Sequence, residues 1–365
     1  MRPIKSNIIV MTTPKFINNK SVFHQELKKR VNQYFEERNK PLTGNFSLHF
    51  KAILLCTTYL FLCIHVIFFT PPAWIAIIEC IVLGILTAAI GFNVMHDGSH
   101  GSFSTNKTIN KFAAISMNFL GASSIMWGIK HNIIHHTYTN VDGIDDDIEA
   151  KPWLRLCETQ KRHRFHKFQH YYFWFLYTLL HIVWIFKTDY DKYFKSKIGE
   201  VAIRKLTLGE HFGFWAAKIG YAIGMIAVPI YVLGFTKWLV GFLIITMTAG
   251  FILSIVFQLA HTVEHTHFPL PVAETNKIEN EWAIHQVETT ANFATKNKLV
   301  SWYVGGLNFQ IEHHLFPKIS HVHYPAISKI IKQTCHDFGV QYIEYTRMRH
   351  AIASHTTYLR RMGRA

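Results

Sequence analysis

The sequence predicts an all-α integral membrane protein in which four transmembrane helices form two hairpins and a helical cytoplasmic cap holds a histidine-rich site. Hydrophobic residues make up 49% of the 365 residues and charged residues only 17%, which is more apolar than an ordinary soluble domain. Four apolar runs are long enough to cross a hydrocarbon core of about 30 Å. Lys and Arg lie almost entirely outside these runs.

The four apolar runs fall into two pairs. They cover about residues 50–70, 73–95, 212–233 and 238–260. Pro71 and Pro72 make the turn in the first pair, and the turn in the second pair contains Lys237. Two shorter runs, 112–127 and 171–186, contain more polar residues, so we interpret them as interfacial or partly buried helices. Counting them as well would give six spans.

The basic residues predict which side of the membrane each segment occupies. The two turns contain only Lys237, whereas the N-terminal, central and C-terminal segments hold nearly all the other Lys and Arg residues. The positive-inside rule places these three segments in the cytoplasm. The second and fourth runs then end at the same boundary, where His96 and His261 emerge. We expect a multi-pass protein of a bacterial inner membrane with its active site on the cytoplasmic side.

The net charge of +15 has an explanation in the same rule and in contact with anionic lipid headgroups. A nucleic-acid-binding protein would instead carry basic clusters in a water-soluble domain. We therefore expect membrane lipids and no nucleic acid as partners. The five cysteines contain no Cys-x-x-Cys pair and are predicted to be free thiols.

Three short histidine-rich motifs lie just outside the apolar runs. They are HDGSH at 96–100, HNIIHH at 131–136 and QIEHH at 310–314. His96 and His100 are four residues apart, as are His131 and His135, so a helix would place each pair on one face. Imidazole is the commonest metal ligand in proteins. The motifs therefore predict a metal site.

A fourth run, QLAHTVEHTH at 258–267, adds His261 and His265, so that eight or nine imidazoles can converge. A zinc site is satisfied by about four protein ligands, so this number indicates two metal ions. Protein affinity alone does not select iron. Two redox-active irons with dioxygen explain so large a neutral ligand set, and the Glu-x-x-His pattern of soluble di-iron bundles is missing.

These motifs resemble the three histidine boxes of the membrane fatty acid desaturases, over roughly residues 54–343. The surrounding segments strengthen the resemblance: HHTYTNVDGIDDD from His135, HQVETTANF from His285 and GGLNFQIEHHLFP from Gly305. The third box begins with Gln310, as in front-end desaturases, which insert a double bond on the carboxyl side of an existing one.

The resemblance also implies how the chain is divided. We expect a fatty acid desaturase domain at 49–343 and a basic C-terminal tail at 344–365. Residues 1–48 would form a cytoplasmic N-terminal segment, in which apolar residues at helical spacing predict an amphipathic helix over 21–37.

The resemblance implies a set of site residues. The expected metal ligands are His96, His100, His131, His135, His136, His261, His313 and His314. Weak ligands, or residues that hold the ligands in place, are expected at Gln310, His285, His265, Asp97, Asn132, Asp145 and Asp146. The acidic run 145–147 in particular is expected to hydrogen-bond ligand imidazoles and fix their tautomers. Candidate substrate-binding walls are Trp127, Trp302 and Phe309.

The implied reaction is oxygen-dependent removal of two hydrogens from adjacent methylenes of a fatty acyl chain, carried as a CoA thioester or as a membrane lipid. The cofactors implied are two iron ions, with dioxygen as co-substrate. The chain has no His-Pro-Gly-Gly motif of a fused cytochrome b5 domain. Electrons would then come from a separate donor of ferredoxin or cytochrome b5 type with its reductase.

Two other functions remain open at this point. A hydroxylase acting on a lipid can share the histidine boxes, because oxygen rebound after the first hydrogen abstraction gives an alcohol. A membrane metal transporter is the more remote alternative. Its polar ligands should lie along a path at mid-membrane depth, whereas the histidines here are predicted to gather at one boundary.

Overall fold

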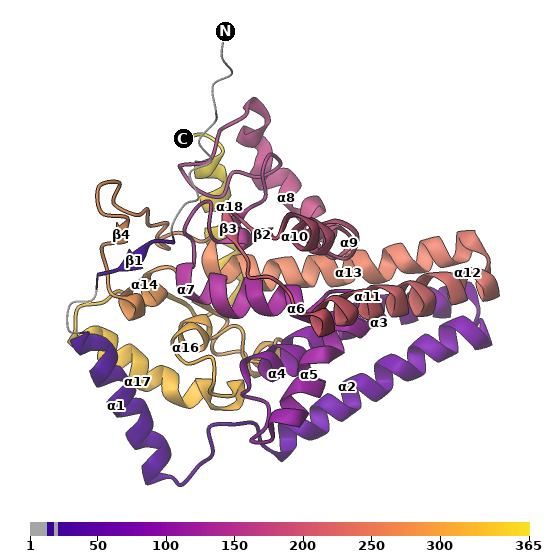
Figure 1. Cartoon of the computed structure of the whole chain (residues 1–365), viewed down its shortest axis with the longest axis horizontal. Helices are drawn as coiled ribbons and strands as arrows, with labels where there is room; N and C mark the ends of the chain where they lie inside the picture. The colour runs from indigo at the N-terminus through magenta and orange to yellow at the C-terminus, as the bar shows by residue number, and fades with distance from the viewer. Residues whose placement is uncertain (1–12, 18–20) are drawn as a thin grey trace.

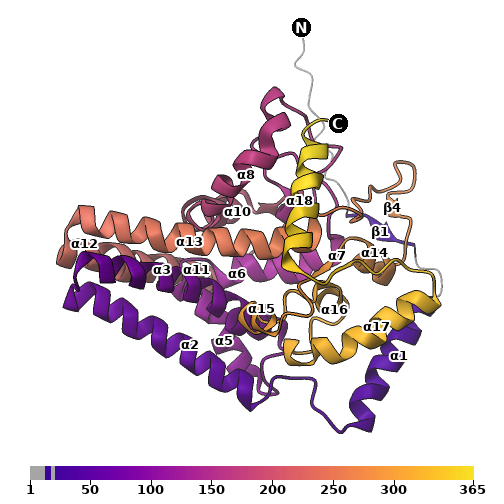
Figure 2. The ribbon, with the colours of Figure 1, turned by 180° about the vertical axis from the view of Figure 1, so that it is seen from behind.

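The computed structural model describes residues 13–17 and 21–365, so the predicted N-terminal segment 1–48 lies partly outside the described residues. The described chain is mostly helical, with long helices that extend to one end and shorter helices that gather at the other (Figure 1). Figure 2 shows the same division from behind.

Four helical stretches are long and apolar enough to cross a membrane, as predicted, by length and composition. They are Phe46–Phe69, Ala73–His100, Leu208–Leu233 and Phe235–His261. The first stretch consists of α2 (Phe46–Ile64) and the π-helical turn His65–Phe69. The second consists of α3 (Ala73–Ile90), the π-helical turn Gly91–Met95 and α4 (His96–His100). The third stretch consists of α11 (Leu208–Ala222), the π-helical turn Ile223–Ala227 and α12 (Val228–Leu233). The fourth is the single helix α13 (Phe235–His261).

Local sequence explains where these stretches begin and end. The Asn45 side chain accepts a hydrogen bond from the Leu48 backbone N–H at 3.0 Å and caps α2. Pro71 and Pro72 separate it from α3, because proline cannot continue the preceding helix. Gly234, with a φ of 81°, makes the turn from α12 to α13.

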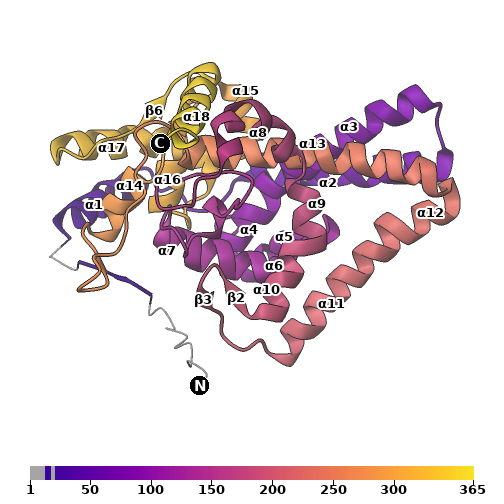
Figure 3. The same cartoon turned by 90° about the horizontal axis from the view of Figure 1, so that it is seen from above.

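The second and fourth stretches pack closely along α3 and α13 (Figure 3). A Cβ atom at Gly84 would lie only 2.7 Å from the backbone oxygen of Ile245, so the close approach of the two helices requires glycine there. This packing brings the C-terminal ends of both stretches together, and these ends carry His96, His100 and His261.

Shorter helices connect the two pairs of long stretches. They are α5 (Lys107–Phe119), α6 (Ser124–Trp127), α7 (His136–Tyr138), α8 (Gln169–Thr178), α9 (Leu180–Val183) and α10 (Asp189–Lys195), with π-helical turns at Gly128–His135 and Trp184–Thr188 and 3₁₀ turns at Asp146–Ile148 and Arg164–Phe168. The chain bends by 114° between Lys107–Phe119 and Ser124–Tyr138, and counting this bent pair as one span would give up to five.

A buried ion pair holds this bend. The Lys218 ammonium donates to the Asp189 carboxylate at 2.7 Å and to the Gly121 carbonyl at 2.9 Å. The same carboxylate accepts from the Ser123 backbone N–H, also at 2.7 Å. The bend therefore fixes where α6 begins, and the helical segment that follows α6 carries the second histidine motif.

The remaining helices follow α13 or precede α2. They are α1 (Val22–Glu37), α14 (Trp282–Glu288), α15 (Lys298–Tyr303), α16 (Gln310–Leu315), the 3₁₀ turn His321–His323, α17 (Tyr324–Asp337) and α18 (Met348–Met362). Three two-stranded ladders pair β1 (Lys15–Phe16) with β4 (Lys277–Ile278), β2 (Lys197–Ile198) with β3 (Val201–Ala202), and β5 (Asn292–Phe293) with β6 (Glu344–Tyr345).

The predicted amphipathic helix over 21–37 is present as α1. Its buried side chains Phe23, Leu27, Val31 and Phe35 pack in one apolar core with residues of α14, α16 and α17. In the predicted C-terminal tail, residues Met348–Met362 form α18, which packs against α8 and α13. Both ends of the chain thus support the helices that carry the histidines.

Candidate metal centre

The histidine motifs meet at one end of the long helices. His96 and His100 lie on α4, and His261 is the last residue of α13. The second motif occupies the π-helical turn Gly128–His135 and the start of α7, and the third lies on α16. All the histidines proposed from the sequence as ligands are buried except His100, which is partly buried.

Their ring nitrogens form two groups compatible with metal binding. His96, His100, His131 and His313 form the first group, and His135, His261 and His314 form the second, with candidate ligand atoms within 4.8 Å of one another in each group. His136 lies between the groups, with ring centroids 4.6 Å from His313 and 4.4 Å from His314. The structure therefore brings together all eight histidines that the sequence proposes as ligands.

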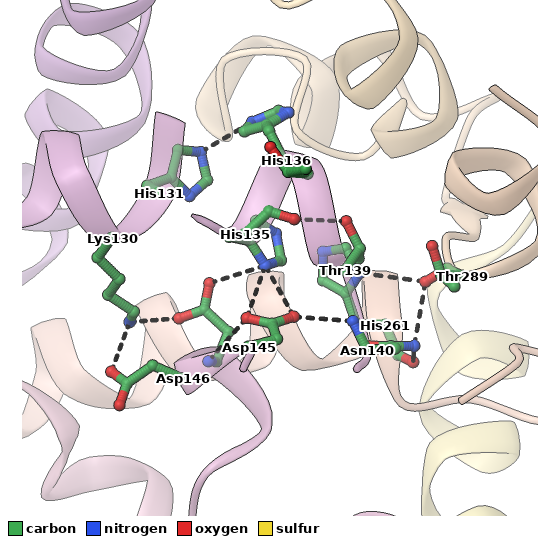
Figure 4. A network of polar contacts seen from close by, with 12 residues as sticks. Lys130, His131, His135, His136, Thr139, Asn140, Asp145, Asp146, His261 and Thr289 are labelled. Carbon is green, nitrogen blue, oxygen red and sulfur yellow. Dashed lines mark hydrogen bonds and ion pairs between the residues drawn. The ribbon is translucent and has the colours of Figure 1, made fainter. Parts of the chain in front are cut away.

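Hydrogen bonds fix the tautomer of the rings in the second group. The His135 Nδ1 lies 3.0 Å from both carboxylate oxygens of Asp145, and the His261 Nδ1 lies 3.3 Å from the Thr289 carbonyl oxygen (Figure 4). These oxygens only accept, so each Nδ1 carries the proton and donates it. The expected contact between the acidic run and a histidine is therefore present.

His314 is held in the same way. Its Nδ1 lies 2.8 Å from the Gln286 Oε1, an amide oxygen that accepts, and 3.3 Å from the Thr139 hydroxyl. All three rings of the second group thus present Nε2, with its lone pair, away from these acceptors.

The first group is held more loosely. The Nε2 atoms of His96 and His136 each lie 3.2 Å from the His131 Nε2. The Nδ1 atoms of His96 and His136 have no hydrogen-bond partner within the part of the chain that the structure describes. The His313 Nδ1 lies 3.1 Å from the Tyr324 hydroxyl, which can donate or accept.

The unpaired nitrogens fit a bound metal. The Nε2 atoms of His100, His261, His313 and His314 are buried without a hydrogen-bond partner among residues 13–17 and 21–365. Each such atom costs about 1–3 kcal/mol, and coordination would remove this cost. Burial and the crowding of other imidazoles lower the pKa of His313 and His314 well below the usual range, which favours the neutral form that a metal requires.

The acidic run beside the second motif has divided roles. The Asp145 carboxylate, besides contacting His135, accepts the backbone N–H groups of Asn140 and Asp147 at 2.8 and 3.0 Å. Asp147 also reaches His135, at 3.3 Å, and forms a further compatible group with His131 and His135. Asp146 instead pairs with Lys192 at 2.6 Å. It also pairs with Lys130, at 3.7 Å (Figure 4).

The other polar candidates near the first motif connect it to distant segments. The Asp97 carboxylate lies 2.9 Å from the His321 Nδ1 and accepts from the Ser320 hydroxyl at 3.0 Å, whereas the His96 Nδ1 is 3.9 Å away. The Asn132 amide donates to the Ser99 backbone oxygen at 3.0 Å. These contacts hold α4 in place.

His265, His285 and Gln310 do not belong to either group of ring nitrogens. His265 is exposed and has a φ of 74°. His285 is buried, its ring packs edge-on against Phe16 with centroids 5.2 Å apart, and it lines a cavity with residues of α18. Gln310 is buried in the first turn of α16, three residues before His313.

Aromatic candidates differ in their distance from the centre. The Trp127 ring stacks on the His131 ring, with centroids 4.3 Å apart and planes inclined by 19°. Phe309 is buried in the core shared by α1 and α17, and Trp302 is half exposed, with the Lys51 ammonium 5.1 Å from its ring centroid. Of the three, Trp127 therefore forms a direct wall of the centre.

The sequence did not reveal two residues that hold the third motif in place. His285 was expected to contact a ligand histidine, but the neighbouring Gln286 contacts His314 instead. The HQVE segment that contains both residues was the available signal. The second such residue is Glu312, whose carboxyl accepts from the Asn292 amide and the Tyr342 hydroxyl, each at 2.7 Å. Burial raises the pKa of Glu312 to about 7. This network anchors α16 to segments before and after it.

Four helices long and apolar enough to cross a membrane, with buried histidine groups compatible with metal binding at one end of them, define a membrane protein with a candidate metal centre. The family model for fatty acid desaturases matches residues 72–346 of this chain. The chain therefore belongs to the fatty acid desaturase family and is an oxidoreductase of that family.

Relatives of known name agree with this assignment. The chain is 37% identical over 349 residues to sn-1 linoleoyl-lipid 6-desaturase of Synechocystis sp., covering 94% of this chain and 96% of the relative. It is 35% identical to sn-1 linoleoyl-lipid 6-desaturase of Arthrospira platensis, covering 96% of both chains. It is 34% identical to acyl-lipid (8-3)-desaturase of Physcomitrium patens, covering 93% of this chain and 72% of the relative.

Proposed function

We propose that this desaturase binds two iron ions through the eight histidines and inserts a double bond into an acyl chain of a membrane lipid, on the carboxyl side of an existing double bond. The observation that carries the proposal is the arrangement of ring nitrogens in two neighbouring groups with unpaired Nε2 atoms. Two groups suit two metal ions, and neutral nitrogen ligands are compatible with iron.

Bound iron and dioxygen would supply the oxidant that removes two hydrogens from adjacent methylenes, with two electrons from a donor, two protons from solvent and two water molecules as the other products. The chain's own contribution is to hold and orient. Asp145, Thr289 and Gln286 fix three rings in the tautomer that leaves Nε2 free. Trp127 covers the first group and keeps water from it.

The names of the relatives support a lipid-linked acyl chain over a CoA thioester. The three relatives above are named as linoleoyl-lipid or acyl-lipid desaturases. Their names differ in the position of the double bond, so we propose the class of reaction and leave the position to experiment. Gln310 at the start of the third box is consistent with this front-end class, and we propose that it lines the site.

We further propose that the long helices form two hairpins and that the histidine end faces the cytoplasm of a bacterial inner membrane. The positive-inside rule supports this orientation. The shorter helices would then form the cytoplasmic cap of a desaturase domain at 49–343. A separate ferredoxin or cytochrome b5 type protein would deliver electrons from that side.

Expression in a host without polyunsaturated lipids tests the proposal. Defined monounsaturated and diunsaturated acyl chains are supplied, and mass spectrometry locates any new double bond and the lipid that carries it. We expect a new double bond between the existing one and the carboxyl group, in intact lipid. An alcohol product would indicate the hydroxylase alternative. Unchanged lipids, together with metal transport into vesicles, would indicate the transporter.

A further inference from the structure

One part of the molecule combines exposed basic and aromatic side chains. We call it the lateral wing and define it as residues 152–178, which include α8, together with 348–365, which include α18. In Figures 1 and 2, α8 and α18 lie side by side and project sideways from the long axis of α13. The Gln169 side chain donates to the Leu359 carbonyl at 2.7 Å and Arg162 to the Gly363 carbonyl at 3.0 Å, so the wing is one unit.

Eight exposed cations lie on the lateral wing. They are Lys161, Arg162, Arg164, Lys167, Arg349, Arg360, Arg361 and Arg364. Within residues 13–17 and 21–365, none of the eight forms an ion pair with a carboxylate. Arg360 and Arg361 lie near the negative end of the α18 dipole, which favours positive charge there. Arg162 donates to the Gly363 carbonyl, and the Lys167 ammonium lies 4.7 Å from the centroid of the Phe168 ring.

Exposed aromatic rings accompany these cations. Phe165, Phe168, Tyr171 and Phe175 are exposed, Tyr171 by 71% and Phe175 by 59%. The spacing of three or four residues from Phe168 to Phe175 places these rings on one side of α8, whereas Phe173 is buried in the core that includes Leu359 of α18. Such a row is unfavourable in water but suits the headgroup layer of a bilayer, where aromatic rings are enriched.

We propose that the lateral wing lies on the membrane surface at the histidine end of the spans and binds anionic phospholipids. The exposed cations would contact lipid phosphates, while the aromatic rings enter the headgroup layer beside them. An acidic electron carrier would also be attracted to the cations. Such a carrier would gain less binding energy from the exposed aromatic rings than a lipid would. The wing also projects away from α7 and α16, which carry histidines proposed as ligands (Figure 1).

The test neutralises the wing and compares it with a matched control. The wing variant carries Arg164→Gln, Lys167→Gln, Arg360→Gln and Arg364→Gln. The control carries Lys28→Gln, Lys40→Gln, Lys318→Gln and Lys329→Gln, which remove the same charge from exposed lysines on the α1 and α17 side of the molecule. Each protein is placed in nanodiscs of phosphatidylcholine alone or mixed with phosphatidylglycerol. Bound lipid is counted by native mass spectrometry, and thermal unfolding is followed.

We expect the wing variant to bind phosphatidylglycerol at least about tenfold more weakly than the wild type and the control, because four of the cations that attract anionic headgroups are neutralised. Its unfolding temperature should match the wild type in phosphatidylcholine and lose the increase that phosphatidylglycerol gives. Unchanged phosphatidylglycerol binding would overturn the proposal. The proposal would also be overturned if the wing variant bound phosphatidylglycerol like the wild type but lost affinity for an acidic electron carrier.

A measurement on the wild-type protein keeps the proposal testable if the variant does not fold. A photoactivatable phosphatidylglycerol is incorporated into the nanodiscs, and the cross-linked peptides are identified. We expect cross-links in 161–168 and 360–365. Their absence there, with cross-links elsewhere on the protein, would contradict the proposal. Neither experiment measures turnover, so failure here leaves the proposed reaction untouched.

Discussion

The two groups of histidines differ in how the protein holds them. In the second group each Nδ1 donates to a fixed acceptor, namely the Asp145 carboxylate, the Thr289 carbonyl or the Gln286 amide. In the first group the His96 Nδ1 has no partner in the described part of the chain, and the His131 ring stacks on Trp127 while its Nε2 contacts only other imidazoles. The protein therefore pre-orients one metal position more firmly than the other.

One ring of the second group, His135, also differs electrostatically from His314 of its own group and from the rings of the first group, because carboxylates lie beside it. Burial lowers the pKa of His135, but the carboxylates of Asp145 and Asp147 outweigh it and raise the pKa of this ring. In the first group, burial and neighbouring imidazoles lower the pKa of His131 well below the usual range. A ring whose Nδ1–H donates to a carboxylate is a more basic ligand. We expect the second group to retain its metal more tightly.

His135→Ala should have the largest effect, because it removes a ligand from the firmer group and leaves the buried Asp145 carboxylate without its imidazole. We expect no detectable new double bond in cellular lipids, while the protein remains inserted in the membrane fraction. His350→Ala, at an exposed histidine of α18, serves as the control and should leave product formation unchanged. Normal product from His135→Ala would contradict the ligand assignment.

Asp145→Asn should have the next largest effect, because it keeps the shape of the side chain but removes the charge that holds the His135 Nδ1–H. Loss of such a partner lowers metal affinity or activity about 10–100-fold. Competition with a chelator measures the affinity. Asp146→Asn is a matched control in the same acidic run, since Asp146 pairs with lysines. Equal losses from both variants would remove the distinction between these carboxylates.

Gln286→Leu should weaken the second group by a smaller amount. It removes the nearest acceptor of the His314 Nδ1–H but leaves the Thr139 hydroxyl 3.3 Å away. We expect a loss of about 1–2 kcal/mol, or roughly 5–30-fold in metal affinity. Metal content after dialysis against a chelator would measure this change. Retention equal to that of the wild type would show that Gln286 does not hold His314.

Tyr324→Phe should have the smallest effect on metal affinity. It tests the first group of histidines, to which His313 belongs. It removes one hydroxyl contact to His313, which corresponds to about 0.5–1.5 kcal/mol. We expect a two- to tenfold loss of metal affinity, confined to the more loosely held metal. If Tyr324→Phe released metal more readily than Gln286→Leu, the order of the two groups would be reversed.

The sequence predicted the long helices because length and apolar composition are local properties of the chain. It did not predict the 114° bend between α5 and α6, which depends on Asp189 and Lys218 from distant segments. The same limit applies at the site. The resemblance to the desaturase family predicted the eight histidines that gather, whereas spacing alone also pointed to His265, which is exposed and belongs to neither group. Neither could reveal the rotation of α14, so the sequence favoured His285 where the neighbouring Gln286 contacts His314.

The acidic run 145–147 shows the same limit of prediction from the sequence. Its proximity to the second motif indicated a contact with imidazole, and Asp145 makes that contact. Asp146 is adjacent in sequence, yet its carboxylate turns toward Lys130 and Lys192. Which of two neighbouring carboxylates faces a ligand depends on the backbone turn that follows Asp145, and composition does not determine that turn.

Metal analysis of purified, catalytically competent enzyme is the most direct test of the central claim, that histidines from four segments of the chain hold a pair of irons. Elemental analysis combined with X-ray absorption spectroscopy should give two irons per chain with predominantly nitrogen ligands. Active enzyme that contains no iron, or one iron with mainly oxygen ligands, would contradict it.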